Sequence, residues 1–461
     1  MSIHTLDDDS LLHLFYLYRP PLFDGDEDEG DLITGGKGWD RELWWYKLAQ
    51  VCQRWRNLIF GSASYLGLCL VCTHGTPIAD MLTHSPPFPL VIDYIDENRD
   101  LTVEDEEGIA LALEQRDRVR RIRLGIPDLQ KLIIIMDGEY PVLEYLIMSP
   151  SDDEVTALMF PDTLQAPHLR QLALIDFTLP IGSQLLTTAV GIVTLSLFST
   201  HPSTHFQLQW ISFMPQLETL TIFFESPAPE SQLMHVPNTT HVTLPNLRTF
   251  VFQGDSAYME AVLHRITTPR LEKLGIQFFN QLAFSVPRLV QFINTTENLR
   301  FDSSEVKFSG DEVHMRVYRE EDETYAVSIS VFCRHLDLQV SLVNQFFNSR
   351  NQISRAVEHL TLEHEKHSRS SEEHNQVDRA EWHKLLMSFN HVKILRVDDG
   401  LVKELSRSLR PDDGLGELPP ELLPELQELT YSGSDDTGDA FTPFIDARKS
   451  AGRPVTLIHL E

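Results

Sequence analysis

The stretch Pro245-Asn-Leu247-Arg-Thr-Phe250-Val-Phe252 carries the pattern that decides the fold. Two variable residues separate Leu247 from Phe250, and one separates Phe250 from Phe252. Such alternation is typical of a strand that buries one face, because successive side chains of a strand point to opposite sides. The stretch therefore predicts a short strand that begins shortly after a proline.

The same pattern recurs along the chain. Counted from the first apolar position, six clear copies follow one another at steps of 26, 23, 25, 30 and 24 residues. Stretches of helical period lie between copies, as at Met259, Val262, Leu263 and Ile266. A strand and a helix within ~25 residues fit one coil of a solenoid, in which each coil buries its apolar face against its neighbours. The six copies begin at Leu143, Leu169, Ile192, Leu217, Leu247 and Leu271.

This spacing resembles that of leucine-rich repeats, and the resemblance covers most of residues 66–461. It implies an α/β fold, a horseshoe-shaped solenoid with a parallel sheet. Leucine-rich repeats usually carry Asn or Cys shortly after the last apolar position of each strand. Because this chain lacks that ladder, we expect irregular coils. The positions concerned are Ser151, Phe177, Thr200, Glu225, Asp255 and Phe279.

Residues 306–332 interrupt the repeat. Apolar residues alternate at Val313, Met315 and Val317, and again from Val327 to Val331. A charged stretch separates the two runs. This arrangement predicts a β-hairpin inserted into one coil of the solenoid.

Residues 1–65 have a different character and predict a small helical domain. An amphipathic run from Thr5 to Tyr18 predicts one helix, with Thr5 and Asp8 resembling a capping box. Residues 19–42 contain an acidic, glycine-punctuated insert, which we expect to be a solvated loop. A second helix is predicted near residues 41–60. The apolar faces of the two helices contain Leu11, Leu14, Phe15 and Tyr18, and Leu48, Val51, Cys52, Trp55 and Ile59.

The segment Val51-Cys52-Gln53-Arg54-Trp55-Arg56 resembles the second helix of the F-box, which carries Val-Cys-x-x-Trp-Arg. Leu6 and Asp9 take the places of the Leu and Glu in the Leu-Pro-x-Glu motif that opens the F-box. Two features depart from that pattern, because Asp7 replaces the usual Pro and the insert between the helices is longer than usual. The whole chain is similar to F-box proteins with irregular leucine-rich repeats, a type abundant in mushroom-forming fungi.

The resemblance implies a substrate-recognition adaptor of an SCF-type cullin–RING ubiquitin ligase that performs no chemistry itself. The helical domain would dock the Skp adaptor subunit of the cullin complex. The solenoid would bind a substrate protein, whose identity the sequence does not define. The docking face would consist of Leu6, Leu11, Leu14, Phe15, Leu48, Val51, Cys52, Trp55 and Ile59.

Substrate contact is expected at strand positions between the apolar ones, since these point away from the core. An alternative is a protein-interaction scaffold outside any ligase, whose N-terminal helices only cap the open end of the solenoid. The candidate substrate residues are Tyr145, Arg170, Gln171, Glu218, Thr219, Arg248, Glu272 and Lys273.

Composition restricts the partners. The 461 residues include 38 Lys plus Arg and 68 Asp plus Glu, which gives a formal net charge of −30. This balance argues against nucleic acid and against anionic membranes, both of which attract clustered basic residues. We expect no transmembrane segment, and the acidic start at residues 7–9 does not resemble a secretory signal. With only four cysteines, the sequence predicts a reduced intracellular protein, cytoplasmic or nuclear.

Catalytic and metal sites find little support, and we expect neither a cofactor nor enzymatic activity. Cys69 and Cys72 have the spacing of a zinc pair, but no second pair follows, so buried thiols are expected. His364 and His367 do not match the zinc motif His-Glu-x-x-His. The arginine-rich segment 116–123 fits either a partner patch or a solvated strand edge. No phosphate-binding loop or nucleophile elbow motif appears.

Overall fold

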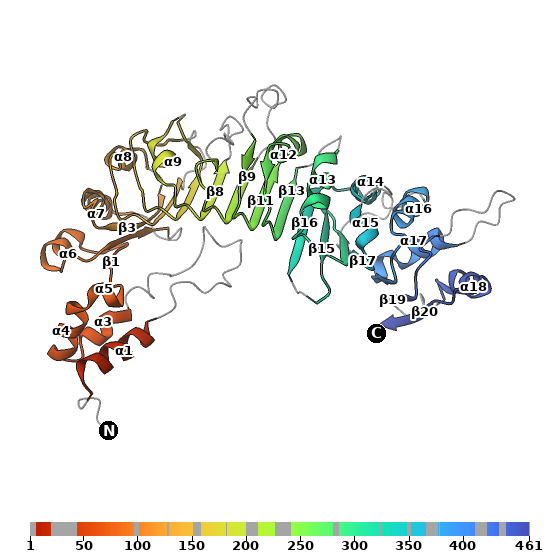
Figure 1. The fold of residues 1–461 in the computed structure, drawn as a ribbon, viewed down its shortest axis with the longest axis horizontal. Coiled ribbons are helices and arrows are strands. Elements are labelled where there is room, and N and C mark those ends of the chain that lie inside the picture. Colours follow the sequence, from red (N-terminus) through yellow and green to blue (C-terminus); the bar gives the residue numbers. More distant parts are fainter. Residues whose placement is uncertain are drawn as a thin grey trace. The chain divides into compact units, whose positions relative to one another are not determined.

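The structure is a computed structural model of residues 1–461, shown in Figure 1. The chain forms two compact units, Met1–Thr200 with Phe213–Leu217, and His201–Ser212 with Glu218–Glu461. The residues that the structure describes are 6–19, 44–95, 101–126, 129–150, 158–180, 182–199, 211–225, 241–279, 285–321, 324–347, 352–365, 377, 379–410, 422–432 and 439–460.

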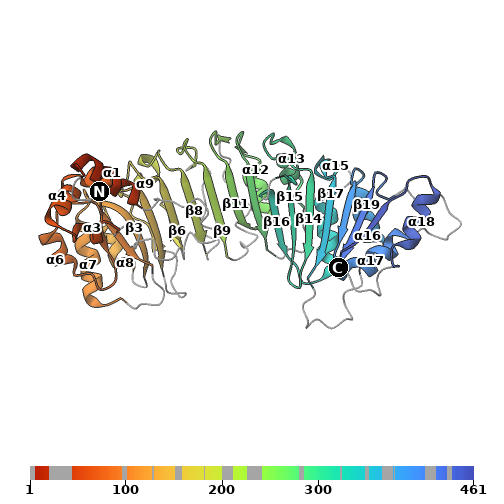
Figure 2. The same cartoon turned by 90° about the horizontal axis from the view of Figure 1, so that it is seen from below.

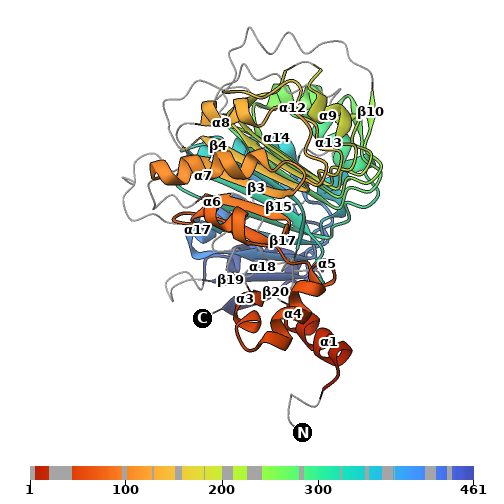
Figure 3. The same cartoon turned by 90° about the vertical axis from the view of Figure 1, so that its left-hand side faces the viewer.

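The first unit begins with a cluster of helices, visible in red in Figure 3. The first helix starts at Asp8 because the Asp7 side chain caps it, accepting a hydrogen bond from the Ser10 backbone N–H at 2.7 Å. The residue that caps this helix is therefore Asp7. Thr5, the expected first residue of a capping box with Asp8, lies outside the described residues. Most of the insert 19–42 also lies outside them. The helices are α1 (Asp8–Tyr18), α3 (Trp44–Ala49), α4 (Gln53–Gly61) and α5 (Ala63–Leu66).

A parallel sheet with the order β1-β2-β3-β4-β6-β8 follows in the same unit. Its strands are β1 (Leu70–Cys72), β2 (Leu90–Tyr94), β3 (Val119–Ile126), β4 (Tyr145–Pro150), β6 (Gln171–Ile175) and β8 (Thr194–Ser199). The short pair β5 (Leu158–Met159) and β7 (Phe177–Thr178) is separate. The helices beside the sheet are α6 (Ile78–His84), α7 (Val103–Glu114), α8 (Leu129–Ile135) and α9 (Gln184–Thr188).

The core of the first unit follows the repeat. The second apolar residue of each copy falls in one row of the sheet, with Ile122 opposite Leu146, Leu146 opposite Leu172, and Leu172 opposite Leu195. All four side chains are buried. A buried row of this kind gains stability from every added strand, at about 1.5–3 kcal/mol for each large apolar side chain.

The second unit contains a sheet in which the chain order reverses locally. Its strands lie in the order β9-β11-β13-β16-β15-β14-β17-β18-β19-β20, and Figure 2 shows them side by side. Only β15 runs against its neighbours, since β13 pairs in parallel with β16 and β14 in parallel with β17. The predicted hairpin corresponds to β15 and β16, and β14 extends it to a three-stranded antiparallel insert within an otherwise parallel sheet.

The strands of the second unit are β9 (Thr219–Phe224), β11 (Thr249–Gly254), β13 (Lys273–Phe278), β14 (Ser303–Phe308), β15 (Glu312–Tyr318), β16 (Tyr325–Phe332), β17 (His359–His364), β18 (Ile394–Val397), β19 (Glu428–Ser432) and β20 (Thr456–Leu460). A short pair comprises β10 (Val242–Thr243) and β12 (Ile266–Thr267). The helices are α12 (Ser256–Leu263), α13 (Pro287–Thr295), α14 (Leu336–Phe346), α15 (Gln352–Ala356), α16 (Arg379–Ser388), α17 (Asp399–Leu409) and α18 (Thr442–Ser450).

The helices α12, α13, α14 and α16 lie over one face of this sheet (Figure 1). Buried aromatic residues of the strands face them. Phe252 stacks on Tyr258 of α12, and Phe308 of β14 meets Trp382 of α16 edge-on with ring centroids 5.6 Å apart. We call the other face, opposite the helices, the outward face. The predicted α/β class with a large, mostly parallel sheet is confirmed.

Candidate partner-binding surface

The helices α1 and α4 form a small core of their own. The Phe15 ring meets the Trp55 indole edge-on at a centroid distance of 4.9 Å. Leu11 of α1 and Ile59 of α4 are completely buried. A cluster of so few helices has little apolar material, so each of these side chains is needed inside.

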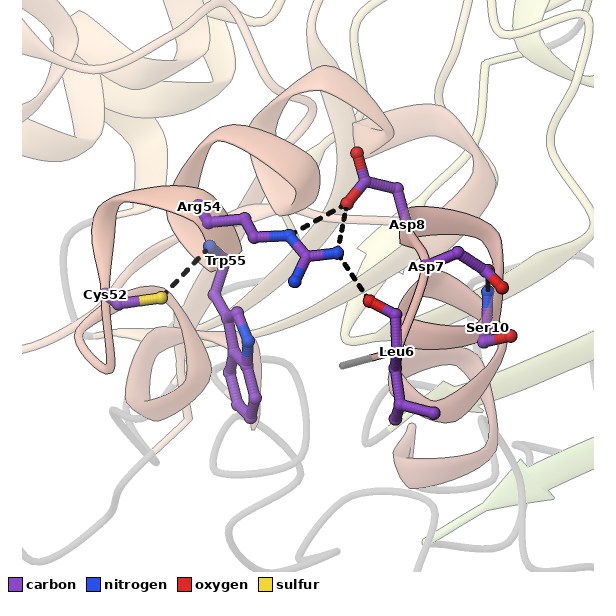
Figure 4. Close-up of polar contacts among 7 residues, drawn as sticks. All are labelled: Leu6, Asp7, Asp8, Ser10, Cys52, Arg54 and Trp55. Atoms are coloured by element: carbon purple, nitrogen blue, oxygen red, sulfur yellow. Dashed lines mark hydrogen bonds and ion pairs between the residues drawn. The ribbon is translucent and has the colours of Figure 1, made fainter. Parts of the chain in front are cut away.

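Polar contacts lock the two helices together, as Figure 4 shows. The Arg54 guanidinium on α4 donates to Asp8 Oδ1 through Nε at 2.9 Å and through Nη2 at 2.7 Å, and Nη2 also donates to the Leu6 carbonyl at 2.6 Å. The Cys52 Sγ caps α4 by accepting from the Trp55 N–H at 3.5 Å. Three positions of the F-box-like motif, Cys52, Arg54 and Trp55, therefore have intramolecular roles.

The nine predicted docking residues do not form one exposed face, and this expectation is corrected. Four of them, Leu11, Phe15, Trp55 and Ile59, are buried, because the apolar faces of α1 and α4 meet each other instead of facing solvent. Leu6, Leu48 and Cys52 are half-buried. Only Leu14 and Val51, with 44% and 57% of their surface accessible, are exposed apolar members of the set.

A different apolar stripe on α1 is open. Leu14, Leu17 and Tyr18 follow one another at i, i+3 and i+4, and 44%, 65% and 63% of their surfaces are accessible. The Tyr18 ring lies 6.3 Å from the Trp44 ring of α3, which extends the stripe. Sequence reasoning missed Leu17. The sequence feature that could have revealed Leu17 is that α1 carries more apolar residues than one helical face can bury.

A second exposed aromatic pair lies elsewhere on the helical cluster. The Tyr16 ring of α1 and the Tyr65 ring of α5 are 5.4 Å apart, and both residues are exposed. Tyr16 follows Leu14 by two residues, which is about 200° around a helix, so the pair faces away from the Leu14 stripe.

The helical cluster also packs against the start of the sheet in the same unit. The buried Trp45 of α3 contacts Phe60 of α4 and Phe88, with centroid distances of 5.9 and 6.1 Å. Phe60 and Phe88 are 5.8 Å apart and complete an aromatic triangle. The compact units therefore divide near residue 200, and residues 1–65 belong to the same unit as the first strands.

The candidate substrate residues lie at the start of strands, as their place in the repeat predicts. In the first unit Tyr145 is opposite Gln171 in the sheet register, and both are half-buried beside the exposed Arg170. In the second unit Thr219 and Lys273 flank Thr249 on β11. Arg248 and Glu272, both exposed like Glu218, form an ion pair of 3.4 Å.

The arginine-rich segment is engaged within its own unit. Arg120 donates to Glu144 at 2.9 Å, Arg123 to Asp93 at 3.0 Å, and Arg118 to the Phe88 carbonyl at 3.1 Å. These side chains connect neighbouring strands and loops, and β3 itself lies between β2 and β4, so these arginines are part of the sheet structure and are not a free cationic patch.

The thiols expected to be buried are buried. Cys69 and Cys72 are inaccessible, and burial raises the pKa of the Cys72 thiol to about 12, which keeps it protonated. Within the described residues, no three His, Cys, Asp or Glu side chains gather to hold a metal ion. His367, which the sequence places three residues after His364, lies outside those residues.

In the part of the chain that the structure describes, none of the helices combines the length and apolarity that a bilayer crossing needs. The sequence matches no family model, and a search of curated proteins finds no match. Its function is therefore inferred from the residues and their geometry.

Proposed function

We propose that this protein is a substrate-recognition adaptor of an SCF-type ubiquitin ligase. The helical cluster α1 to α5 docks the Skp adaptor subunit, and the repeated strands form a leucine-rich-repeat-like solenoid that holds a substrate protein. The chain acts without chemistry of its own. Its contribution is proximity, which raises the effective concentration of substrate at the ligase.

The observation that carries this proposal is the exposed stripe of Leu14, Leu17 and Tyr18. A small protein surface rarely leaves neighbouring large apolar side chains in water unless a partner covers them. The stripe lies on α1, the first helix of the segment that resembles the F-box, and the motif residue Trp55 holds that helix through its contact with Phe15. Such a role places the protein in the cytoplasm or the nucleus.

The experiment is co-expression with a fungal Skp subunit followed by co-purification. Leu14→Asp places a charge in the stripe and should abolish the association while leaving the melting temperature unchanged. Tyr16→Asp is the matched control, because Tyr16 has 45% of its surface accessible against 44% for Leu14 but faces the other way. Association that survives Leu14→Asp, or that Tyr16→Asp removes equally, would exclude this docking face.

A second candidate function is a repeat scaffold outside any ligase, and the aromatic triangle of Trp45, Phe60 and Phe88 favours it. In that case the helices serve to cover the first strand, whose apolar face would otherwise meet water. Deleting residues 1–62 separates the two functions. A remainder that aggregates indicates a cap, whereas a remainder that stays folded indicates a separate docking module.

A further inference from the structure

The outward face of the second unit carries a charged area defined by the strand register. Arg316 of β15 is opposite Glu305 of β14, and Glu305 is opposite Thr361 of β17. Two residues further along the same strands, Lys307 of β14 is opposite Glu363 of β17. The residues between these positions are buried beneath the helices, so the charged side chains share the outward face.

Most cations around this area already have partners. The Lys307 ammonium lies 3.3 Å from Glu365. Glu320 lies 2.6 Å from His359 and 3.7 Å from Arg396. Lys307 and Arg396 therefore have ion-pair partners outside the pair Glu305 and Glu363.

Two carboxylates within the area remain unpaired. Among the described residues, neither Glu305 nor Glu363 makes an ion pair or a side-chain hydrogen bond, although both are half-buried. Partial burial and the neighbouring Glu305 raise the pKa of the Glu363 carboxyl, and the charges of Lys307 and Arg316 offset only part of that rise. A half-buried carboxylate without a partner is unfavourable, and a cation placed beside it removes that cost.

Beside this area, the outward positions of three strands are uncharged except for Lys273 at the start of β13. In the sheet register Val251 and Gln253 of β11 stand opposite Gly275 and Gln277 of β13, and the next strand continues with Ser328 and Ser330. Charge depletion at the centre of a surface is characteristic of protein interfaces, because uncharged groups lose less hydration on contact. In a chain with a net charge of −30, a platform without acidic side chains beside two unpaired acids is a distinctive combination.

We propose that this outward face binds an extended segment of a partner protein. Uncharged residues of the segment lie over β11, β13 and β16, and a Lys or Arg side chain reaches between Glu305 and Glu363. This inference rests on the proposed function in one respect: if the protein is a ligase adaptor, the bound partner is its substrate. Two strand spacings separate β16 from β14, about 10 Å, so the basic residue follows the uncharged ones by about three extended residues.

The geometry favours a basic partner over an acidic one. The four central positions of the charged area are Glu305, Lys307, Arg316 and Glu363. Two of them are cations, and of these Lys307 has an ion-pair partner whereas the exposed Arg316 has none among the described residues. Arg316 stands opposite Glu305. An incoming carboxylate would meet both unpaired acids beside that single arginine. An incoming lysine or arginine would meet both acids with its own hydrogens, since cationic side chains donate to several oxygens at once.

The test selects random twelve-residue peptides displayed on phage against the full-length protein at physiological salt. Enriched peptides are synthesised, and their affinities are measured by fluorescence anisotropy. We expect selected peptides to contain Lys or Arg beside uncharged residues. The double change Glu305→Gln with Glu363→Gln should weaken them about 10-fold or more, as loss of charge-assisted hydrogen bonds does.

The matched control is Glu104→Gln with Glu107→Gln, two exposed acids on α7 of the first unit. It removes the same charge and should leave the affinity unchanged. Equal weakening in both double variants, selection of peptides without basic residues, or no selected peptide at all would overturn the proposal. Failure of the ligase proposal is separate, because Leu14→Asp changes association with Skp and leaves peptide affinity unchanged.

Discussion

The ring of Phe15 and the indole of Trp55 meet edge-on at a centroid distance of 4.9 Å, and this contact joins α1 to α4. The residue that most resembles an F-box signature is therefore a core residue of the helical cluster. Its function is to hold the helix that presents Leu14 and Leu17.

Trp55→Ala should unfold the helical cluster without unfolding the second unit. Removing a buried indole costs about 3–5 kcal/mol, more than such a small core can lose. Hydrogen exchange of the α1 and α4 amides measures this, and we expect protection in both helices to vanish. Leu17→Ala, at an exposed position, should leave protection intact. Unchanged protection in Trp55→Ala would mean that the ring contact does not hold the helices together.

The Arg54–Asp8 ion pair should contribute only modestly. The two side chains are 39% and 59% accessible, and exposed pairs typically add about 0.2–1 kcal/mol. A double-mutant cycle of Arg54→Ala and Asp8→Ala isolates the pair from the helix-dipole effect of Asp8, and 1 M salt should reduce the coupling. A coupling that is insensitive to salt would contradict a screened electrostatic contact.

The repeat made the strands predictable. Phe250 and Phe252 alternate in sequence, and both side chains are buried on β11, in register with Leu220 and Ile222 on β9. Period-two alternation works here because one face of each strand packs beneath helices. The local pattern needs no knowledge of distant residues.

The position of β14 was not predictable, because its sequence Ser303-Ser-Glu-Val-Lys-Phe308 has only two large apolar residues. Its place in the sheet depends on pairing with β15 and β17, which the chain reaches later. The sequence also could not show which apolar residues of α1 are buried and which are exposed. Leu11 and Leu14 are neighbours on the helix, and the packing of α1 against α4 leaves Leu11 buried and Leu14 exposed.

Protonation of His314 should destabilise the second unit at low pH. Burial, with Arg316 and Lys307 nearby, lowers the pKa of His314 from 6.5 to about 4, and its Nε2 lies 2.8 Å from Ser328 Oγ. The unfolded chain therefore binds more protons between these values, so stability falls as the pH drops from 6.5 to about 4. Urea midpoints measured across this range check it. His314→Gln should show a smaller fall, and an identical fall would assign the effect to other groups.

The Gln339 amide should hold the inserted strands in place. Its Nε2 donates to the Ser309 carbonyl at 2.8 Å and to the Cys333 carbonyl at 2.6 Å, so α14 is tied to the turn between β14 and β15 and to the residue that follows β16. Gln339→Met keeps the bulk but leaves buried carbonyls unpaired, at a cost of about 1–3 kcal/mol. Thermal unfolding should show the loss. Leu338→Ala, at an exposed neighbour on the same helix, should be close to neutral, and equal losses would contradict the role of the amide.

Ser304 and Ser303, adjacent on β14, should respond in opposite directions to the same substitution. Ser304 is fully buried, and its hydroxyl has no hydrogen-bond partner among the described residues. It stands between the apolar Val317 and Leu360 in the core row. Ser304→Ala removes an unpaired buried hydroxyl and should raise stability by up to about 1–3 kcal/mol.

The Ser303 hydroxyl, in contrast, donates to Asp302 Oδ1 at 2.7 Å, and that same oxygen accepts from the Glu320 N–H at 3.0 Å. Ser303→Ala removes one of the two donors that hold the carboxylate, so we expect a loss of about 0.5–1.5 kcal/mol. Thermal unfolding of the two variants under identical conditions gives the comparison. Two losses of equal size would mean that the Ser304 hydroxyl has a partner, and that the packing of this row differs from the one described.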